Sequence, residues 1–173
     1  VEIPTDEEVE EFLKRVNDGN KNEFNVIRNI AIVQLIKGSG IRSEELINMD
    51  INDLHLYEED RPYMMILGKG NIEMYDKVYM SKRAKMYLEE YLTMRDIFIR
   101  ERKITNKALF LSNENKRMSK GAITSFFERY SDGGIYPHML RHWVGTDLYN
   151  RTNNIMIVQR QLRHKNLETA AKI

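Results

Sequence analysis

The stretch Tyr136-Pro137-His138-Met139-Leu140-Arg141-His142 predicts the start of a helix, because proline is tolerated in a first turn, where its missing N–H breaks no hydrogen bond. Residues three and four apart share one face of a helix. His138, Arg141 and His142 therefore project together, while an apolar stripe runs along another side. A guanidinium matches phosphate oxygens with a planar fork of donors, and imidazole adds a further donor. This face is suited to binding an anion such as a phosphate.

Three further segments accompany this stretch along the chain: Gly40-Ile41-Arg42-Ser43-Glu44-Glu45-Leu46, Gly68-Lys69-Gly70-Asn71 and Leu162-Arg163-His164-Lys165-Asn166-Leu167-Glu168-Thr169. Together with Pro137 to His142 they resemble the catalytic domain of the tyrosine recombinases, the phage integrase family. One segment alone is weak, since a GKGN turn or an HxxRH pair arises by chance, but four in this order are specific. The resemblance covers nearly the whole chain, from Pro4 onward.

The resemblance implies an enzyme that breaks and rejoins DNA in site-specific recombination, such as integration or excision of a mobile element. A tyrosine attacks a phosphodiester in line, which leaves a 3′-phosphotyrosyl link and a free 5′ hydroxyl. The protein must neutralise the non-bridging oxygens and protonate the departing 5′ oxygen. The resemblance implies no metal and no other cofactor, and two guanidiniums fit that expectation because they can replace a divalent cation.

The same resemblance assigns Arg42 and Arg141 to the clamp on the transition state. By analogy with arginine fingers, each is expected to contribute on the order of 10³-fold in rate. Glu45, one turn after Arg42, is expected to orient that guanidinium or a neighbouring histidine. Taken alone, such a pair is only a surface salt bridge worth about 0.5 kcal/mol.

The remaining site residues are assigned by the resemblance and by local chemistry. Lys69 lies between two glycines that let it swing, and it is expected to be the general acid for the 5′ oxygen; Lys77 is a weaker candidate. His138 would donate to a non-bridging oxygen or assist proton transfer from the nucleophile. His164 would contact the same phosphate, whereas His142 is expected to pack and hydrogen-bond rather than react.

The nucleophile is expected outside the given sequence. In the family the reactive tyrosine follows a stretch like Leu-Glu-Thr-Thr-x-x-Tyr, and residues 167–173 reproduce that approach up to Ile173. None of the nine tyrosines has this position, so we expect the nucleophile immediately after Ile173. The expectation is therefore a single catalytic domain over residues 1–173 without the family's N-terminal DNA-clamping domain, which binds DNA weakly and does not cleave it.

Arg163 departs from the family pattern, which has glycine before this histidine. Glycine suits a left-handed helix end, where a β-carbon costs about 1 kcal/mol. Two explanations follow. Either the turn differs locally, or Arg163 gains a contact with phosphate, and both affect the expected role of His164.

Composition and charge fit a DNA-binding domain. A chain of 173 residues forms one domain, and the absence of cysteine excludes disulfides and thiolate metal sites. The sequence contains no run of about 18 apolar residues that would span a membrane. Residues 1–60 hold 6 Lys and Arg against 15 Asp and Glu, whereas residues 61–173 hold 21 against 11. The basic part, with a balance of +10, is the part expected to contact nucleic acid.

Hydrophobic periodicity predicts a mainly α fold with a small three-stranded antiparallel sheet at one edge, as in recombinase catalytic domains. Helices are expected over residues 5–19, 22–37, 81–103 and 119–130, from 137, over about 155–162, and after Asn166; strands are expected over 54–56, 62–67 and 75–80, with a short extended piece at 109–111.

Other functions fit parts of the sequence. His138 and His142, with His164, have the spacing of zinc ligands in a hydrolase, although no glutamate lies between them and Arg141 would place a cation beside the metal. A catalytically inactive DNA-binding module on the same scaffold and a type IB topoisomerase are further alternatives.

The main expectation is a bacterial or phage-encoded enzyme on the nucleoid in the cytoplasm. Its partner would be double-stranded DNA with recombination sites, bound as a tetramer by the full-length protein; the chain alone would be a monomer.

Overall fold

The computed structural model describes residues 2–67 and 75–163. In these residues the chain is mostly helical and carries one three-stranded antiparallel sheet, which confirms the predicted fold class. The elements in chain order are α1 (Asp6–Asp18), α2 (Glu23–Ser39), α3 (Ser43–Asn48), the short 3₁₀ helix η1 (Ile51–Asp53), β1 (Leu54–His55), β2 (Tyr63–Leu67), β3 (Tyr75–Tyr79), α4 (Lys82–Arg102), α5 (Lys120–Ser131), α6 (Pro137–Thr152) and α7 (Ile155–Leu162).

Helix α1 begins and ends at the residues that local chemistry predicts. The Thr5 hydroxyl accepts from the Glu8 amide at 3.1 Å, and the Glu8 carboxylate accepts from the Thr5 amide at 3.4 Å. This reciprocal capping box satisfies two amides that no helical carbonyl can reach. Gly19 then closes the helix by donating its amide to the Arg15 carbonyl.

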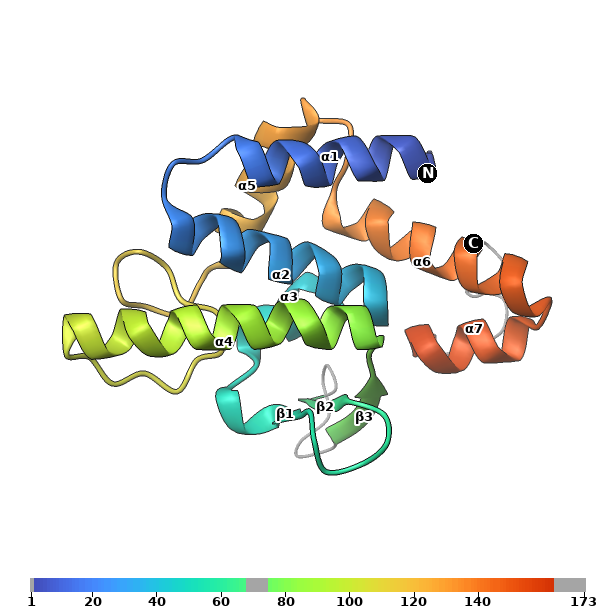
Figure 1. The fold of residues 1–173 in the computed structure, drawn as a ribbon. Helices are drawn as coiled ribbons and strands as arrows, with labels where there is room; N and C mark the ends of the chain where they lie inside the picture. The colour runs from blue at the N-terminus through green and yellow to red at the C-terminus, as the bar shows by residue number, and fades with distance from the viewer. Residues whose placement is uncertain (1, 68–74, 164–173) are drawn as a thin grey trace.

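Helix α2 is the centre of the fold. It packs against α1, α4 and α6, and Figure 1 shows it running between α1 and α4. Because neighbours surround it, Ile32, Val33 and Ile36 are buried in addition to Ala31 and Leu35. Apolar side chains are therefore buried on all sides of α2, as expected of a helix in the core.

The sheet lies at the edge of the helical body, below α4 in Figure 1. β2 pairs with β1 on one side and β3 on the other, with Met64 opposite Val78 and Leu67 opposite Tyr75. Met64 and Val78 are buried, whereas Leu67 and Tyr75 are exposed. The alternation fixes the register, because a slip by one residue would expose the buried set. The predicted GKGN loop, residues 68–71, lies outside the described residues.

The extended piece at 109–111 crosses the core instead of joining the sheet. The hydroxyl of Tyr91, on α4, donates to the Leu109 carbonyl at 2.8 Å and accepts from the Leu111 amide at 3.1 Å. Arg28, on α2, donates to the Leu111 carbonyl at 2.9 Å. These side chains satisfy the backbone of a buried segment that would otherwise lack partners.

Helices α6 and α7 pack against each other, and α6 also contacts α2. Val144 on α6 packs with Val158 and Leu162 on α7, apart from the main core. In the part of the chain that the structure describes, no helix combines the length and the apolar character needed to cross a membrane. The helix predicted after Asn166 lies outside the described residues.

Gly40 closes α2 where that helix meets the end of α7. Its φ is +74°, and its amide donates to the Ile36 carbonyl. A β-carbon at Gly40 would lie 2.3 Å from Cδ2 of Leu162. Glycine is therefore required twice here, for the left-handed backbone and for the close approach of α7.

We predict that Gly40→Ala lowers the free energy of unfolding by about 3 kcal/mol, because the left-handed penalty and the overlap with Leu162 act together. Urea unfolding followed by circular dichroism measures the change. Gly121→Ala is the matched control, since the nearest atom to its added β-carbon is 3.9 Å away, and it should be neutral or stabilise by about 0.5 kcal/mol. Equal effects of the two substitutions would contradict the role of Gly40.

Candidate active site

Arg141 joins the ends of two helices. It lies on α6, its side chain is almost fully buried with 5% exposure, and its guanidinium donates from Nη1 to the Gly40 carbonyl and from Nη2 to the Leu162 carbonyl. Both acceptors belong to C-terminal helix turns, whose carbonyls carry partial negative charge. Arg141 thereby holds the end of α2 beside the end of α7.

Arg42 follows Gly40 by two residues and caps α3. Its amide donates to Oε1 of Glu45 at 3.0 Å, and its guanidinium Nη1 lies 3.5 Å from Oε2 of the same carboxylate. The Arg42 side chain keeps 41% of its surface exposed, whereas Glu45 keeps 9%. Arg42 thus presents its charge outward, while Glu45 is buried beneath it.

These residues border a cleft of about 240 Å³. It is lined by Ile41, Arg42, Ser43, Glu44, Lys120, Pro137, His138 and Arg141. The lining comes from the first turns of α3, α5 and α6, whose amides favour an anion. The structure therefore brings Arg42, His138 and Arg141 together from distant parts of the chain, with their predicted roles in catalysis still to be tested.

Lys120 is a site residue that the sequence analysis missed. It opens α5, lines the cleft and forms an ion pair with Glu44 at 3.0 Å. A local signal for it exists: lysine in the first turn of a helix is unfavourable, because the helix dipole prefers acidic residues there. Glu44 offsets the charge of this lysine, and both side chains border the cleft.

His138 and His142 interact with each other on α6. Their Nε2 atoms are 3.0 Å apart, so one ring donates while the other accepts. Burial, and then the charges of Arg141 and Arg42, lower the pKa of His138. Burial, His138 and Arg141 lower the pKa of His142 in the same way. Both rings are therefore neutral at pH 7 in the free protein, and His142 makes the hydrogen bond expected of it.

Arg163 ends α7 in the left-handed conformation, with φ 57° and ψ 42°. Its guanidinium donates from Nη1 to Oε2 of Glu45 and from Nη2 to Oε1, both at 2.6 Å. Of the two explanations offered for Arg163, a different turn is wrong, because the turn keeps the conformation that glycine favours. The arginine gains a carboxylate partner in the protein.

The charges of this cluster are unbalanced. Burial, and then the guanidiniums of Arg42 and Arg163, lower the pKa of Arg141 to about 9, so Arg141 still carries its charge at neutral pH. Burial acts to raise the pKa of Glu45, but hydrogen bonds from Arg163 and the charges of both arginines outweigh it and lower that pKa. Glu45 is the carboxylate closest to these three guanidiniums, and Asp76 lies 4.0 Å from Arg163, so cations outnumber carboxylates and a bound anion would relieve the repulsion.

Two predicted residues, Lys69 and His164, lie outside the described residues. Lys77, the weaker candidate for the general acid, lies on β3 and forms an ion pair with Glu59 at 2.6 Å. Within residues 2–67 and 75–163, no three His, Cys, Asp or Glu side chains are arranged to hold a metal ion. The zinc alternative required His164, so it stays a prediction.

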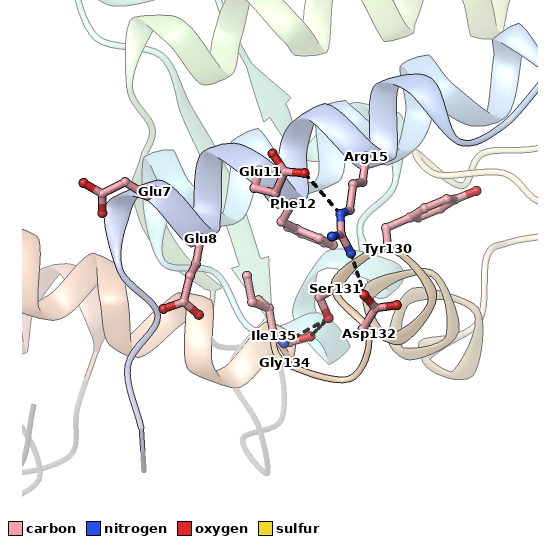
Figure 2. Close-up of a pocket in the computed structure, with 10 residues that line it drawn as sticks. All are labelled: Glu7, Glu8, Glu11, Phe12, Arg15, Tyr130, Ser131, Asp132, Gly134 and Ile135. Carbon is pink, nitrogen blue, oxygen red and sulfur yellow. Dashed lines mark hydrogen bonds and ion pairs between the residues drawn. The ribbon is translucent and has the colours of Figure 1, made fainter.

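A second cavity, between α1 and α5, has the opposite character (Figure 2). Glu7, Glu8 and Glu11 of α1 are among the residues that line it. Arg15 bridges this group to the far side, 3.3 Å from Glu11 and 2.7 Å from Asp132. Because carboxylates outnumber the single arginine in its lining, this cavity repels phosphate, and the cleft at Arg141 is the candidate active site.

The chain is similar to known proteins over nearly its whole length. The phage integrase family matches residues 4–173. Tyrosine recombinase XerC of Proteus mirabilis is 30% identical over 173 aligned residues, covering 96% of this chain and 53% of XerC. The chain spans about half the length of the curated relatives it matches.

Solved structures show the same fold. The crystal structure of XerA recombinase superposes with a TM-score of 0.80 at 22% identity, covering 99% of this chain and 57% of XerA. The XerH site-specific recombinase bound to difH substrate, in a pre-cleavage complex, gives a TM-score of 0.80 at 23% identity, covering 98% and 49%. Helices and sheet are therefore arranged as in these recombinases.

We predict that the two histidines make the fold less stable in acid. Their pKa values are lowered from the ordinary 6.5, so the native state binds these protons less readily than the unfolded chain. Their contribution to the free energy of unfolding is therefore fully present above pH 6.5 and is lost as the pH falls below it. Urea unfolding from about pH 7 to about pH 5 should show a steeper loss for the wild type than for the variant with His138→Gln and His142→Gln. If the free energies of unfolding of the wild type and the variant fall in parallel with pH, the two histidines do not cause the loss of stability in acid.

Proposed function

The chain belongs to the phage integrase family, and on that premise we propose that it is the catalytic domain of a tyrosine recombinase that carries out site-specific DNA recombination. The main observation that supports the proposal is that Arg42, His138 and Arg141 line one cleft. These residues lie on α6 and at the start of α3, and Arg141 itself holds the chain segment that presents Arg42. Such a cleft fits one DNA phosphate.

In the proposed reaction the scissile phosphate occupies this cleft. Its non-bridging oxygens accept hydrogen bonds from Arg42 and from the Nη atoms of Arg141, whose charge offsets the charge that develops in the transition state. His138, neutral in the free protein, donates to an oxygen or accepts a proton from the nucleophile. His164 is expected to contact the same phosphate.

The covalent step needs two further groups, which the family resemblance implies. A tyrosine immediately after Ile173 attacks phosphorus, and the bond from phosphorus to the 5′ oxygen breaks. Lys69 gives its proton to that oxygen, so the products are a 3′-phosphotyrosyl link and a free 5′ hydroxyl. The 5′ hydroxyl of another strand then attacks the phosphotyrosyl link and releases the tyrosine. This reverse reaction completes the strand exchange without metal or other cofactor.

The proposed partner is double-stranded DNA carrying recombination sites. The positive balance of residues 61–173 supports it, because cationic side chains that neutralise phosphates supply most of the affinity for DNA. Four protomers of the full-length protein would act on two duplexes in the bacterial cytoplasm, to integrate or excise a mobile element. The chain alone is proposed to be a monomer.

The proposal is tested by whether the protein forms a covalent adduct with DNA. The chain, extended by the residues that follow Ile173 in its gene, is incubated with nicked duplexes that carry a randomised target, and products are separated on a denaturing gel. We expect a protein–DNA adduct whose DNA can be sequenced to read the target. Arg42→Ala and Arg141→Ala should each lower the rate of adduct formation on the order of 10³-fold.

The control is Arg100→Ala, which removes one positive charge from the exposed end of α4 and should leave the rate unchanged. The chain ending at Ile173 should form no adduct, and an adduct there would show that the nucleophile is misplaced. If the extended chain binds DNA but forms no adduct, the inactive DNA-binding module is the better account. With a supercoiled plasmid that carries the target as substrate, relaxed circles without recombinant products would indicate a topoisomerase.

A further inference from the structure

A larger cleft lies next to the candidate active site. Its volume is about 420 Å³, against about 240 Å³ for the cleft at Arg141. The C-terminal end of α2, the start of α4, one side of α6 and Gln161 of α7 border it. Figure 1 shows the ends of α2 and α7 meeting the start of α4. The two clefts share no lining residue, so the larger one is a separate site.

The lining of this second cleft is cationic. It contains four basic side chains and one carboxylate: Lys37, Arg61, Arg83, Arg151 and Asp147. Asp147 pairs with Arg151 at 3.1 Å, and Lys37 lies 3.5 Å from Glu10. Within residues 2–67 and 75–163, Arg61 and Arg83 form no ion pair, and the Arg61 guanidinium instead lies 4.2 Å from the ring centre of Tyr79. These two guanidiniums keep donors for an added anion.

The helix ends around the cleft do not cancel this charge. The carbonyls that end α2 already have donors, since Gly38 accepts from the Ser81 amide at 3.0 Å and Ser39 accepts from the Gln161 side chain at 2.8 Å. The first turn of α4 contains basic residues and no acidic one, and the helix dipole places partial positive charge there. The cleft therefore favours an anion.

Gln34 indicates that the ligand carries more than phosphate. It lies on α2, lines the cleft and is only 3% exposed. Its side-chain amide has no hydrogen-bond partner in the part of the chain that the structure describes, although buried amides are nearly always paired. An amide both donates and accepts, whereas a phosphate group only accepts. A ligand with donors and acceptors beside its phosphates would satisfy both atoms of Gln34.

The remaining side of the cleft is apolar and aromatic. Trp143, Val144 and Leu148 line it from α6. The indole N–H of Trp143 is already used, because it donates to Asp6 at 2.9 Å. This side therefore offers apolar contact to a planar ring, and the volume of the cleft lies in the range of sites for small molecules.

We propose that this cleft binds a nucleotide. Its phosphates accept hydrogen bonds from Arg61 and Arg83 at the start of α4, and its base lies against Trp143 with one edge paired to the amide of Gln34. The inference does not depend on the proposed function, because it uses no residue of the active-site cleft. It adds a small-molecule site next to the chain segments that Arg141 joins.

Nucleotide binding can be followed at the site itself, because Trp143 is the only tryptophan of the chain. ATP is titrated into the protein, with affinity measured by calorimetry and the indole fluorescence recorded in parallel. We expect saturable binding that changes the fluorescence, and much weaker binding of tripolyphosphate or adenosine, because each has only part of the contacts. Equal affinity for tripolyphosphate and ATP, or no binding of ATP, would overturn the inference.

Substitutions then locate the ligand. Arg61→Gln and Arg83→Gln should each weaken ATP binding roughly tenfold, the effect of one charge-assisted hydrogen bond. Gln34→Leu, which keeps the volume of the side chain, should weaken ATP binding by a similar factor and leave tripolyphosphate binding unchanged. Arg100→Gln, an exposed charge elsewhere on α4, is the matched control and should have no effect.

Two results would assign the cleft or the ligand differently. Loss of ATP binding in Arg42→Gln, with no effect of Arg61→Gln, would place the nucleotide in the active-site cleft. If Arg61→Gln and Arg83→Gln weaken binding of a short DNA duplex but not of ATP, the cleft contacts the DNA backbone. Either result would contradict the proposed nucleotide site.

Discussion

The hydrogen bonds from the buried guanidinium of Arg141 to the Gly40 and Leu162 carbonyls determine the shape of the site. They join the C-terminal turns of α2 and α7, and the residues just beyond these turns are Arg42 and Arg163. A planar group with five donors can serve two carbonyls and still offer N–H groups to a third acceptor, which a lysine could not do. One side chain thus builds the cleft and lines it.

Assembling this site places cations side by side. Arg42, Arg141 and Arg163 converge, and Glu45 is the carboxylate between them. Burial and mutual repulsion lower the pKa of Arg141, so the free protein holds an arrangement that favours an added negative charge. The neutral state of His138 has the same cause. On the proposed function, DNA phosphate supplies the missing charge, and binding and catalysis use the same electrostatic imbalance.

Local chemistry made much of the fold predictable. Thr5 and Glu8 form the expected capping box, and Pro137 opens α6 as the sequence indicates. The contacts that define the site were not predictable in this way, because Arg141 reaches Gly40 across 101 residues and Arg163 reaches Glu45 across 118. The family resemblance supplied Arg42, His138 and Arg141 of the cleft, but not Lys120. It could not supply the partner of Arg163, since that residue is where this chain departs from the family.

The most direct test is a crystal structure of the chain with tungstate, a tetrahedral dianion that resembles phosphate and is located by its anomalous scattering. The account predicts tungstate in the cleft, within hydrogen-bond distance of the guanidiniums of Arg42 and Arg141, with the bonds from Arg141 to Gly40 and Leu162 intact. An empty cleft with tungstate ordered elsewhere, or an Arg141 that leaves both carbonyls, would contradict it.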